Sequence, residues 1–257
     1  MALISIVTIV RNDSPGLLRT RASITCQEWR DFEWLVVDGA STDGTAQLAL
    51  GIDDAFVRAY SEPDEGIYDA MNKGLTLATG QFVVFLNAGD ALADSGLLKR
   101  VAARLTETDA DFLYGDSLEA FSSVQPICKL ARGHQHVRYG MFACHGAMYY
   151  RRALIGEARY DTTYRISGDY CFTAEFLKKL PRIAQVDEPL CIFDLSGVSS
   201  MNRRRGRAEN WRVQREVLSL SLMHRCAIRA VYLGTALLAT YFPGVYKVLR
   251  FRRRNEY

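Results

Sequence analysis

Short apolar runs and amphipathic stretches alternate over the first ninety residues of the chain. The apolar runs have the length of buried strands and cover residues 3–10, 33–38, 57–61 and 82–86. The stretches between them favour helices and cover residues 14–24, 45–50 and 68–79. This alternation predicts an α/β fold with a mostly parallel central sheet and helices on both of its faces.

The second half of the chain has a less regular pattern. We expect a strand over residues 144–150, a helix over 170–180, and a strand pair or one long strand over 183–193. Residues 119–135 show no pattern and are expected to be loops. Residues 196–200 form a polar loop of the kind that closes over a ligand.

Polar side chains follow three of the predicted strands. Asn12 and Asp13 follow the first strand, Asp38 ends the second, and the segment Asn87–Asp90 follows the fourth. Ligands of such sheets bind at the carboxyl ends of the strands, and carboxylates there suit Mg²⁺ or Mn²⁺. The competing interpretation is that Asp and Asn stand there only as turn formers. No GxGxxG follows the first strand and no GxxxxGK[ST] is present, so other nucleotide sites have little support.

The last 57 residues have a different character. They hold 13 Lys and Arg but only three Glu, a net charge of +10, so residues 1–200 carry −7. An apolar, aromatic run over residues 230–246 is interrupted by Pro243-Gly244 and is short for a membrane span. We therefore divide the chain into a domain over 1–200 and a basic, amphipathic helical tail over 201–257. Binding to an anionic membrane surface is favoured for this tail over packing on the core, and nucleic acid is not expected as a partner.

Composition narrows the class of protein further. With 49% hydrophobic and 24% charged residues, the chain is neither disordered nor collagen-like. The six cysteines include no CxxC pair, which argues against a zinc site or a disulfide framework. The apolar N-terminus lacks a basic n-region and a cleavage site, so it is expected to be a strand. These features predict a cytoplasmic protein, peripheral on the inner face of the cell membrane.

Long motifs in the first half of the chain resemble those of family 2 glycosyltransferases with the GT-A (Rossmann-like) fold, of the colanic-acid and polysaccharide biosynthesis type. They include LVVDGASTDGT (residues 35–45), SEPDEGIYDAMNKG (61–74) and FLNAGD (85–90). The resemblance covers roughly residues 3–200. It implies inverting transfer of a sugar from a nucleotide-diphosphate donor.

The resemblance also implies roles for individual residues. Asp169 corresponds to the catalytic base, and Asp90 to the acid that binds the divalent cation bridging the diphosphate. Asp38 corresponds to the acid that hydrogen-bonds the nucleotide base. The remaining nucleotide-sugar-binding positions are Thr8, Asn12, Asp69, Asn72, Lys73 and Asn87. His145 and Ser199 fall where contacts to the acceptor or the diphosphate are expected.

Two positions depart from the family pattern. The common Asp-x-Asp-Asp is Asn87-Ala88-Gly89-Asp90 here, so the ribose contact expected from position 89 is missing, and Asp64 or Asp69 is a candidate substitute. Gly168 stands where many relatives have Glu before the base. A divalent cation remains the expected cofactor.

These features together predict an enzyme that moves a sugar from a UDP- or GDP-sugar to a lipid-linked saccharide in surface polysaccharide biosynthesis. Inversion needs one carboxylate to take the proton of the acceptor hydroxyl. Because the Asn-Ala-Gly-Asp motif keeps only one of the family's acidic residues, a second hypothesis is a non-catalytic nucleotide-sugar-binding or assembly protein at the membrane. A nucleotidylyltransferase is disfavoured because no Gly-rich basic loop follows the first strand.

Overall fold

The computed structural model describes residues 2–121, 124–195, 202–242 and 244–245. The described strands are β1 (Ile4–Val10), β2 (Phe32–Asp38), β3 (Val57–Ser61), β4 (Phe82–Phe85), β5 (Ala91–Leu92), β6 (Phe112–Phe121), β7 (Val124–Lys129), β8 (Met148–Arg151) and β9 (Ile183–Asp194). The described helices are α1 (Ser14–Thr25), α2 (Thr45–Leu50), α3 (Ile67–Leu77), α4 (Leu97–Thr108), α5 (Arg152–Ile155), α6 (Gly168–Leu177), α8 (Arg203–Glu216) and α9 (Leu222–Tyr241), with 3₁₀ turns η1 (His134–Tyr139) and η2 (His145–Ala147).

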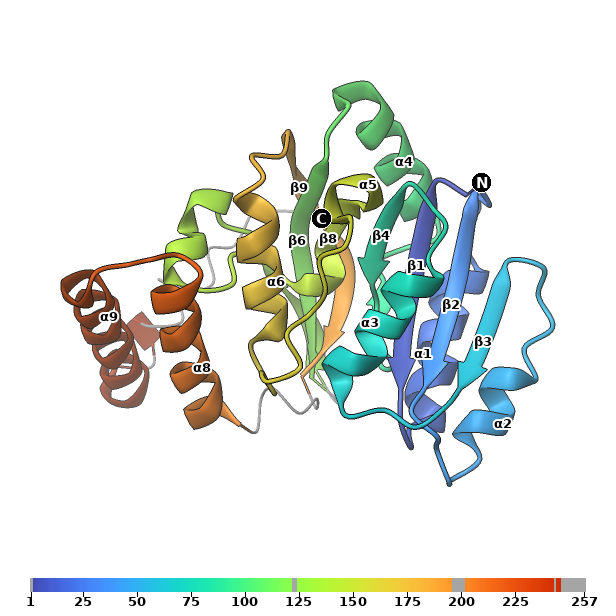
Figure 1. Ribbon diagram of the computed structural model, residues 1–257, viewed down its shortest axis with the longest axis horizontal. Coiled ribbons are helices and arrows are strands. Elements are labelled where there is room, and N and C mark those ends of the chain that lie inside the picture. Colours follow the sequence, from blue (N-terminus) through green and yellow to red (C-terminus); the bar gives the residue numbers. More distant parts are fainter. Residues whose placement is uncertain (1, 122–123, 196–201, 243, 246–257) are drawn as a thin grey trace.

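One sheet forms the centre of the molecule, in the order β3-β2-β1-β4-β8-β6-β9-β5, with β7 paired to β6 (Figure 1). Strands β3, β2, β1 and β4 are mutually parallel. Strand β8 is antiparallel to both β4 and β6, whereas β9 is parallel to β6. The predicted α/β fold is confirmed, with a sheet that is mixed because β8, β5 and β7 are reversed.

Alternating side chains of the strands supply two apolar layers. On one face, Val7 and Ile9 of β1 join the buried side chains of α3, α6 and α8. On the other, Ile4 and Ile6 pack with those of α1, α2 and α4. Trp34 is buried completely in this second layer. Helices thus cover both faces of the sheet, as the sequence pattern predicts.

Some predicted elements were wrong or missing. Helix α4 was not predicted, and residues 119–121 and 124–129, expected to be loops, belong to β6 and β7. The strand expected over residues 144–150 begins only at Met148, because η2 precedes it. The helix expected over 170–180 begins at Gly168 and ends at Leu177. The polar loop over 196–200 lies outside the described residues.

The C-terminal segment is helical, as expected, but its two helices are in different surroundings. Helix α8 packs beside α6, and its Val213 and Val217 belong to the core. Helix α9 lies at the far end of the molecule, beyond α8 (Figure 1). Among its residues only Arg225 and Ile228 are buried. In the described part of the chain, no helix combines the length and apolarity needed to cross a membrane.

Candidate active site

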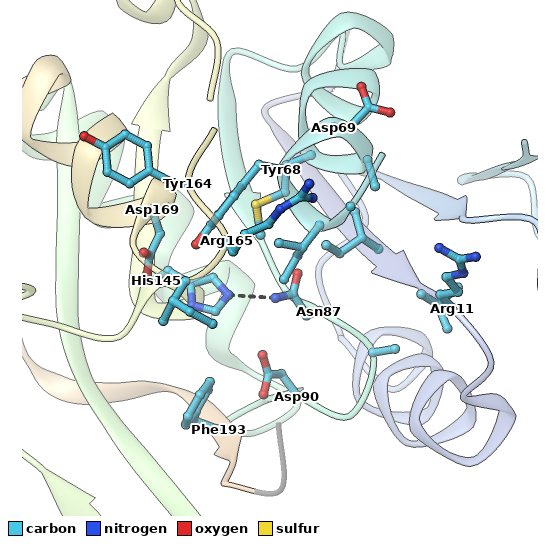
Figure 2. Close-up of a pocket in the computed structure, with 18 of the residues that line it drawn as sticks. Arg11, Tyr68, Asp69, Asn87, Asp90, His145, Tyr164, Arg165, Asp169 and Phe193 are labelled. Atoms are coloured by element: carbon cyan, nitrogen blue, oxygen red, sulfur yellow. Dashed lines mark hydrogen bonds between the residues drawn. The ribbon is translucent and has the colours of Figure 1, made fainter. Parts of the chain in front are cut away.

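A cavity of about 840 Å³ opens at the carboxyl ends of β1 and β4. The N-terminal part of α3, the turn η2, the end of β9 and the segment leading into α6 complete its wall. Its lining includes Asn87, Asp90, His145 and Asp169, four of the residues expected at the site (Figure 2). Residues from both halves of the chain therefore meet in one cavity, where ligands of α/β sheets bind.

Helix α1 holds the Asn87–Asp90 turn through the side chain of Thr20. The hydroxyl of Thr20 donates to the Asp90 carbonyl at 2.6 Å and accepts from the Gly89 amide at 3.1 Å. Gly89 has a φ of +97°, and a Cβ built on it lies 3.3 Å from Asp194 Oδ2. An acidic residue at position 89 is therefore disfavoured by backbone strain and by a neighbouring carboxylate, which explains the first departure from the family pattern.

Asp90 and His145 form a buried polar centre in the cavity. Only 4% of Asp90 is exposed, and its Oδ1 accepts the Asp194 amide at 3.0 Å. Burial raises the pKa of Asp90 to about 6, against the opposing effect of His145. Burial lowers the pKa of His145, while the charge of Asp90 opposes this shift. His145 Nε2 lies 3.1 Å from Asn87 Nδ2.

The side-chain oxygen of Asn87 is a buried atom with no hydrogen-bond partner. Together with the carboxylates of Asp90 and Asp194, it gives the cavity a set of oxygen donors. Oxygen donors of this kind are those that Mg²⁺ and Mn²⁺ prefer. Among the described residues, no three or more His, Cys, Asp or Glu side chains cluster as metal ligands. Any cation here therefore needs further oxygens from a bound ligand or from water.

Asp169 lies in the first turn of α6 and lines the cavity, close to Tyr68 of α3 (Figure 2). Its Oδ1 accepts the amide of Tyr170 at 2.8 Å. Burial raises the pKa of Asp169 to about 6, although the hydrogen bonds from the Tyr170 amide and from its own amide oppose this shift. A carboxylate with this pKa is ionised at neutral pH and has more affinity for a proton than an exposed Asp.

Gly168 is required by the tyrosine that packs against it. A Cβ at this position lies 2.7–2.8 Å from carbons of the Tyr68 ring, so any larger residue displaces that ring. Tyr68 is 5% exposed and stacks on Tyr160 with ring centroids 5.6 Å apart. The second departure from the family pattern thus follows from close packing between α3 and the start of α6.

The structure does not bring Thr8 or Asp38 to the cavity wall. The Thr8 hydroxyl is fully buried, donates to the Leu86 carbonyl at 2.7 Å and accepts from Trp34 Nε1 at 2.9 Å. The Asp38 carboxylate is also fully buried and accepts from the Ser41 amide at 2.9 Å, the Ser41 hydroxyl and the Ser61 hydroxyl. Both side chains therefore organise the strand ends beside the cavity.

Asn12 joins the end of β1 to the loop after β2. The side-chain Oδ1 of Asn12 accepts the Thr42 backbone amide at 2.9 Å, and the backbone amide of Asn12 donates to the Ser41 hydroxyl at 2.7 Å. Its φ of +51° is in the left-handed region that Asn tolerates. Next to it, Arg11 lies 3.8 Å from Asp64, and both line the cavity.

Helix α3 contributes the remaining predicted residues. Asp69 lines the cavity and accepts the Glu65 amide at 3.1 Å. Lys73 donates to the Pro63 carbonyl at 2.6 Å and pairs with Glu62 and Asp69, outside the cavity. Asn72 also lies outside: its amide group exchanges two hydrogen bonds with the Tyr160 backbone, at 2.9 and 2.7 Å.

Sequence reasoning missed several polar residues of the wall, among them Arg165 and Asp194. Arg165 donates to the Glu65 carbonyl at 2.6 Å, and Asp194 pairs with Arg19 at 3.1 Å; Arg165, Glu65 and Asp194 all line the cavity. Asp194 had a signal in the sequence, because it directly follows the predicted strand over 183–193. Arg165 lies in a segment without periodicity and had none. Ser199 lies outside the described residues.

Comparison with known proteins places these features in a family. Residues 5–127 match the family described as "Glycosyl transferase family 2". A "PGL/p-HBAD biosynthesis glycosyltransferase" of Mycobacterium bovis is 34% identical over 176 residues, which are 66% of this chain and 68% of that protein. An uncharacterised glycosyltransferase of Mycobacterium tuberculosis is 31% identical over 214 residues, 77% of each chain.

Solved structures share the fold. Residues 1–349 of S. aureus TarS in complex with UDP superpose with a TM-score of 0.66 at 19% identity, covering 97% of this chain and 75% of that one. The mannosyltransferase PcManGT from Pyrobaculum calidifontis, in complex with GDP-Man and Mn²⁺, gives 0.63 at 17% identity over 96% and 83%. Because the family model matches residues 5–127, and because the two relatives above are more than 30% identical over two thirds or more of their length and are named glycosyltransferases, the chain, which shares the GT-A fold of these structures, belongs to glycosyltransferase family 2.

Proposed function

We propose that this glycosyltransferase moves a sugar from a UDP- or GDP-sugar to a saccharide hydroxyl with inversion at the anomeric carbon. The observation that carries the proposal is one cavity that holds both Asp90, on the side of β4, and Asp169, at the start of α6. The first belongs with the departing diphosphate and the second with the incoming hydroxyl. Two chemically distinct ends are what a displacement at the anomeric carbon needs.

Asp169 is the base in this mechanism. Its carboxylate takes the proton of the acceptor hydroxyl as the oxygen attacks the anomeric carbon. Its pKa of about 6 leaves it ionised at neutral pH and raises its proton affinity above that of an exposed Asp. The Tyr170 amide holds Oδ1, which directs the carboxylate before the acceptor arrives. A single displacement needs no enzyme nucleophile, so one carboxylate suffices for inversion.

A divalent cation fits the opposite end of the cavity. Asp90 would hold it, with the unpartnered Asn87 Oδ1 and the Asp194 carboxylate at the same wall. When bound, the cation neutralises charge that develops on the leaving diphosphate. The presence of Mn²⁺ beside GDP-Man in a structure of the same fold supports this assignment.

Two observations support a UDP- or GDP-sugar as the donor: the ligands in solved structures of the same fold, and the residues at the strand ends beside the cavity. Structures of the same fold hold UDP, UDP-GlcNAc or GDP-Man. In this chain the nucleotide would lie against Arg11, Asp64 and Asp69, which line the cavity near β1 and α3. The residues behind them fix that wall through the hydrogen bonds described above: Thr8, Asn12, Asp38, Asn72 and Lys73.

The acceptor class and location rest on the C-terminal helices. Apolar side chains of α9 are exposed to an unusual degree, among them Leu233 at 55% and Leu237 at 58%. The tail also carries the charge of +10. We infer that α9 lies on the anionic inner face of the cell membrane and brings the cavity to a lipid-linked saccharide acceptor. A relative is named a glycosyltransferase of PGL/p-HBAD biosynthesis, which supports a role in biosynthesis for this chain as well.

Release of UDP or GDP tests this function. The full chain is incubated with a panel of UDP- and GDP-sugars, Mn²⁺ and a polyprenyl-linked saccharide fraction. We expect Asp169→Asn to lower kcat by about 10²- to 10⁴-fold, with nucleotide binding retained. Glu175→Gln, at an exposed position on the same helix, is the matched control. Full activity of Asp169→Asn would remove it from the base role, and binding without turnover in the wild type would favour a non-catalytic binding protein.

A further inference from the structure

The turn that leads into α6 is held by a residue from the C-terminal segment. Ser167 is the N-cap of α6, but its side chain makes no capping hydrogen bond to the helix. Its hydroxyl instead donates to the carbonyl of Gly206 in α8, at 3.3 Å. Amides at the start of a helix lack partners within the helix, so this terminus needs an acceptor from elsewhere.

Glu209 of α8 supplies an acceptor for the N-cap amide and for the two amides just before it. Its Oε2 accepts from the Ile166 amide at 2.8 Å and the Ser167 amide at 2.9 Å, and its Oε1 accepts from the Arg165 amide at 3.1 Å. Arg205, one helical turn earlier, donates to the same carboxylate at 2.9 Å. One side chain thus receives three consecutive backbone amides of the turn.

The contact is close and largely shielded from solvent. Only 11% of the Glu209 side chain is exposed. Burial raises the pKa of Glu209, but the hydrogen bonds from Ile166, Ser167 and Arg205 outweigh it, so the pKa lies below the ordinary value. A Cβ on Gly206 lies 3.2 Å from Ile166 Cγ2, so a glycine there permits the close approach of α8. Glu209 is therefore ionised at neutral pH and held against the turn.

The turn that Glu209 holds determines where Asp169 lies. Asp169 comes two residues after Ser167, and its carboxylate direction is fixed by the next amide of the same helix. On its other side Arg165 donates to the Glu65 carbonyl, and the start of α6 packs on Tyr68, whose hydroxyl accepts the Gly168 and Asp169 amides. A shift of the 165–167 backbone therefore carries the carboxylate with it. Misplacement of a reacting group by about 1 Å costs on the order of 10²-fold in rate.

We propose that Glu209 is a positioning residue for Asp169: by receiving the amides of residues 165–167 it sets the place of the base, so α8 is part of the catalytic centre. This inference rests on the proposed function, in which Asp169 is the base. It assigns the first helix of the basic segment a role in the reaction itself, separate from any role of α9 at a membrane.

Three variants of the full chain separate positioning from general stability. Glu209→Ala removes the acceptor. Glu209→Gln keeps one acceptor oxygen at the same reach. Glu216→Ala is the matched control, since Glu216 lies on the same helix and pairs only with Arg212 and Arg215 among the described contacts. For each we measure kcat and KM for the nucleotide sugar that the wild type consumes, UDP or GDP binding by calorimetry, and amide hydrogen exchange.

We expect Glu209→Ala to lower kcat by about 10- to 100-fold, with KM and nucleotide affinity within about twofold of wild type. The amides of residues 165–167 should exchange faster in this variant. Glu209→Gln should recover most of both losses, and Glu216→Ala should match wild type. If Glu209→Ala does not fold, Glu209→Gln decides the question through a smaller fall in kcat at unchanged KM.

Wild-type kcat in Glu209→Ala, or faster exchange without loss of kcat, would overturn the positioning role. A loss confined to KM would also overturn it, because the residue would then serve binding. Failure of the proposed function has a different signature: full activity of Asp169→Asn, whatever the behaviour of Glu209. The exchange measurement reports on the turn without relying on turnover.

Discussion

At the scale of single residues, Asp90 and Asp169 share a feature that most carboxylates of the chain lack. Both lie in surroundings that favour the protonated form, and burial raises the pKa of each to about 6. Such shifts gather at functional sites because a reaction or a bound cation needs the charge there. Burying that charge lowers the free energy of unfolding of the protein when no cation or substrate is bound.

Asp90→Asn makes this cost measurable. Near pH 4 the carboxyl is protonated in the folded chain and about half protonated in the unfolded chain, so the substitution should change the free energy of unfolding by only about 0.5 kcal/mol. Between about pH 4 and pH 6 the unfolded chain has lost this proton while the folded chain still binds it, so the wild type loses stability across this window. Asn has no proton to lose and still accepts the Asp194 amide. We expect Asp90→Asn to be more stable by up to about 3 kcal/mol at pH 8.

Urea unfolding at pH 4 and pH 8, with EDTA present, checks this pH dependence. Asp53→Asn, at an exposed position, serves as the control and should show no such difference. Equal effects of Asp90→Asn at the two pH values would contradict the raised pKa.

The sequence pointed to Asn87 and Asp90 through a motif that follows a predicted strand, and to His145 and Asp169 through the family resemblance; the structure brings all four to one cavity. It did not identify Glu209 as part of the site, since the contact joins residues 42 to 44 positions apart through backbone amides. Backbone donors have no signature in a sequence. The departures at Gly89 and Gly168 were visible there, but their reasons, a positive φ and the Tyr68 ring, needed the structure.

At the scale of elements, periodicity predicted the strands and helices of the first ninety residues well. There each strand is short, apolar and bounded by turn formers, so the local pattern and the tertiary structure agree. The pattern was weaker for β6 and β7, because residues 117–121 and 124–129 include charged and polar side chains that pair across the two strands. Their pairing with each other and with β9 decides that they are strands, and pairing between distant segments is not written in a local pattern.

Thr8 provides a test at this scale because it joins three strands. Its hydroxyl connects β1 to Trp34 of β2 and to the carbonyl that follows β4. Thr8→Val leaves both partners buried and unsatisfied, so we expect a loss of about 1–3 kcal/mol in the free energy of unfolding. Nucleotide affinity should stay within about twofold, because the side chain does not line the cavity.

Denaturant unfolding and calorimetry with UDP and GDP measure the two effects of the Thr8 substitution. Thr8→Ser retains the hydroxyl and should restore stability. A large loss of nucleotide affinity in Thr8→Val at near-normal stability would instead assign Thr8 a direct contact with the donor.

At the scale of the whole molecule, positive charge and exposed apolar side chains are both concentrated in the C-terminal segment. Residues 1–200 carry −7 and supply most of the residues that line the cavity, while the last 57 residues carry +10 and include a helix with most of its side chains exposed. Arg225 and Arg229 lie over the Trp211 ring, at 4.6 and 5.8 Å, at the junction of α8 and α9. An exposed apolar helix with cations beside it supports the proposal that α9 binds a membrane surface.

The double variant Leu233→Glu/Leu237→Glu tests whether that phase is an anionic membrane. Burying one leucine contributes about 1.5 kcal/mol or more, so each substitution should weaken binding to vesicles by about 10-fold or more. Leu180→Glu, at an 88% exposed position on the body, should bind as wild type does.

Wild-type binding should also weaken in 0.5 M salt and on neutral vesicles, because screening and loss of lipid charge both remove the attraction to the arginines. Co-sedimentation with vesicles of anionic phospholipid measures all of these. Unchanged binding of the double variant would reject the membrane role of α9. A marked loss of its thermal stability would show that α9 packs on protein instead.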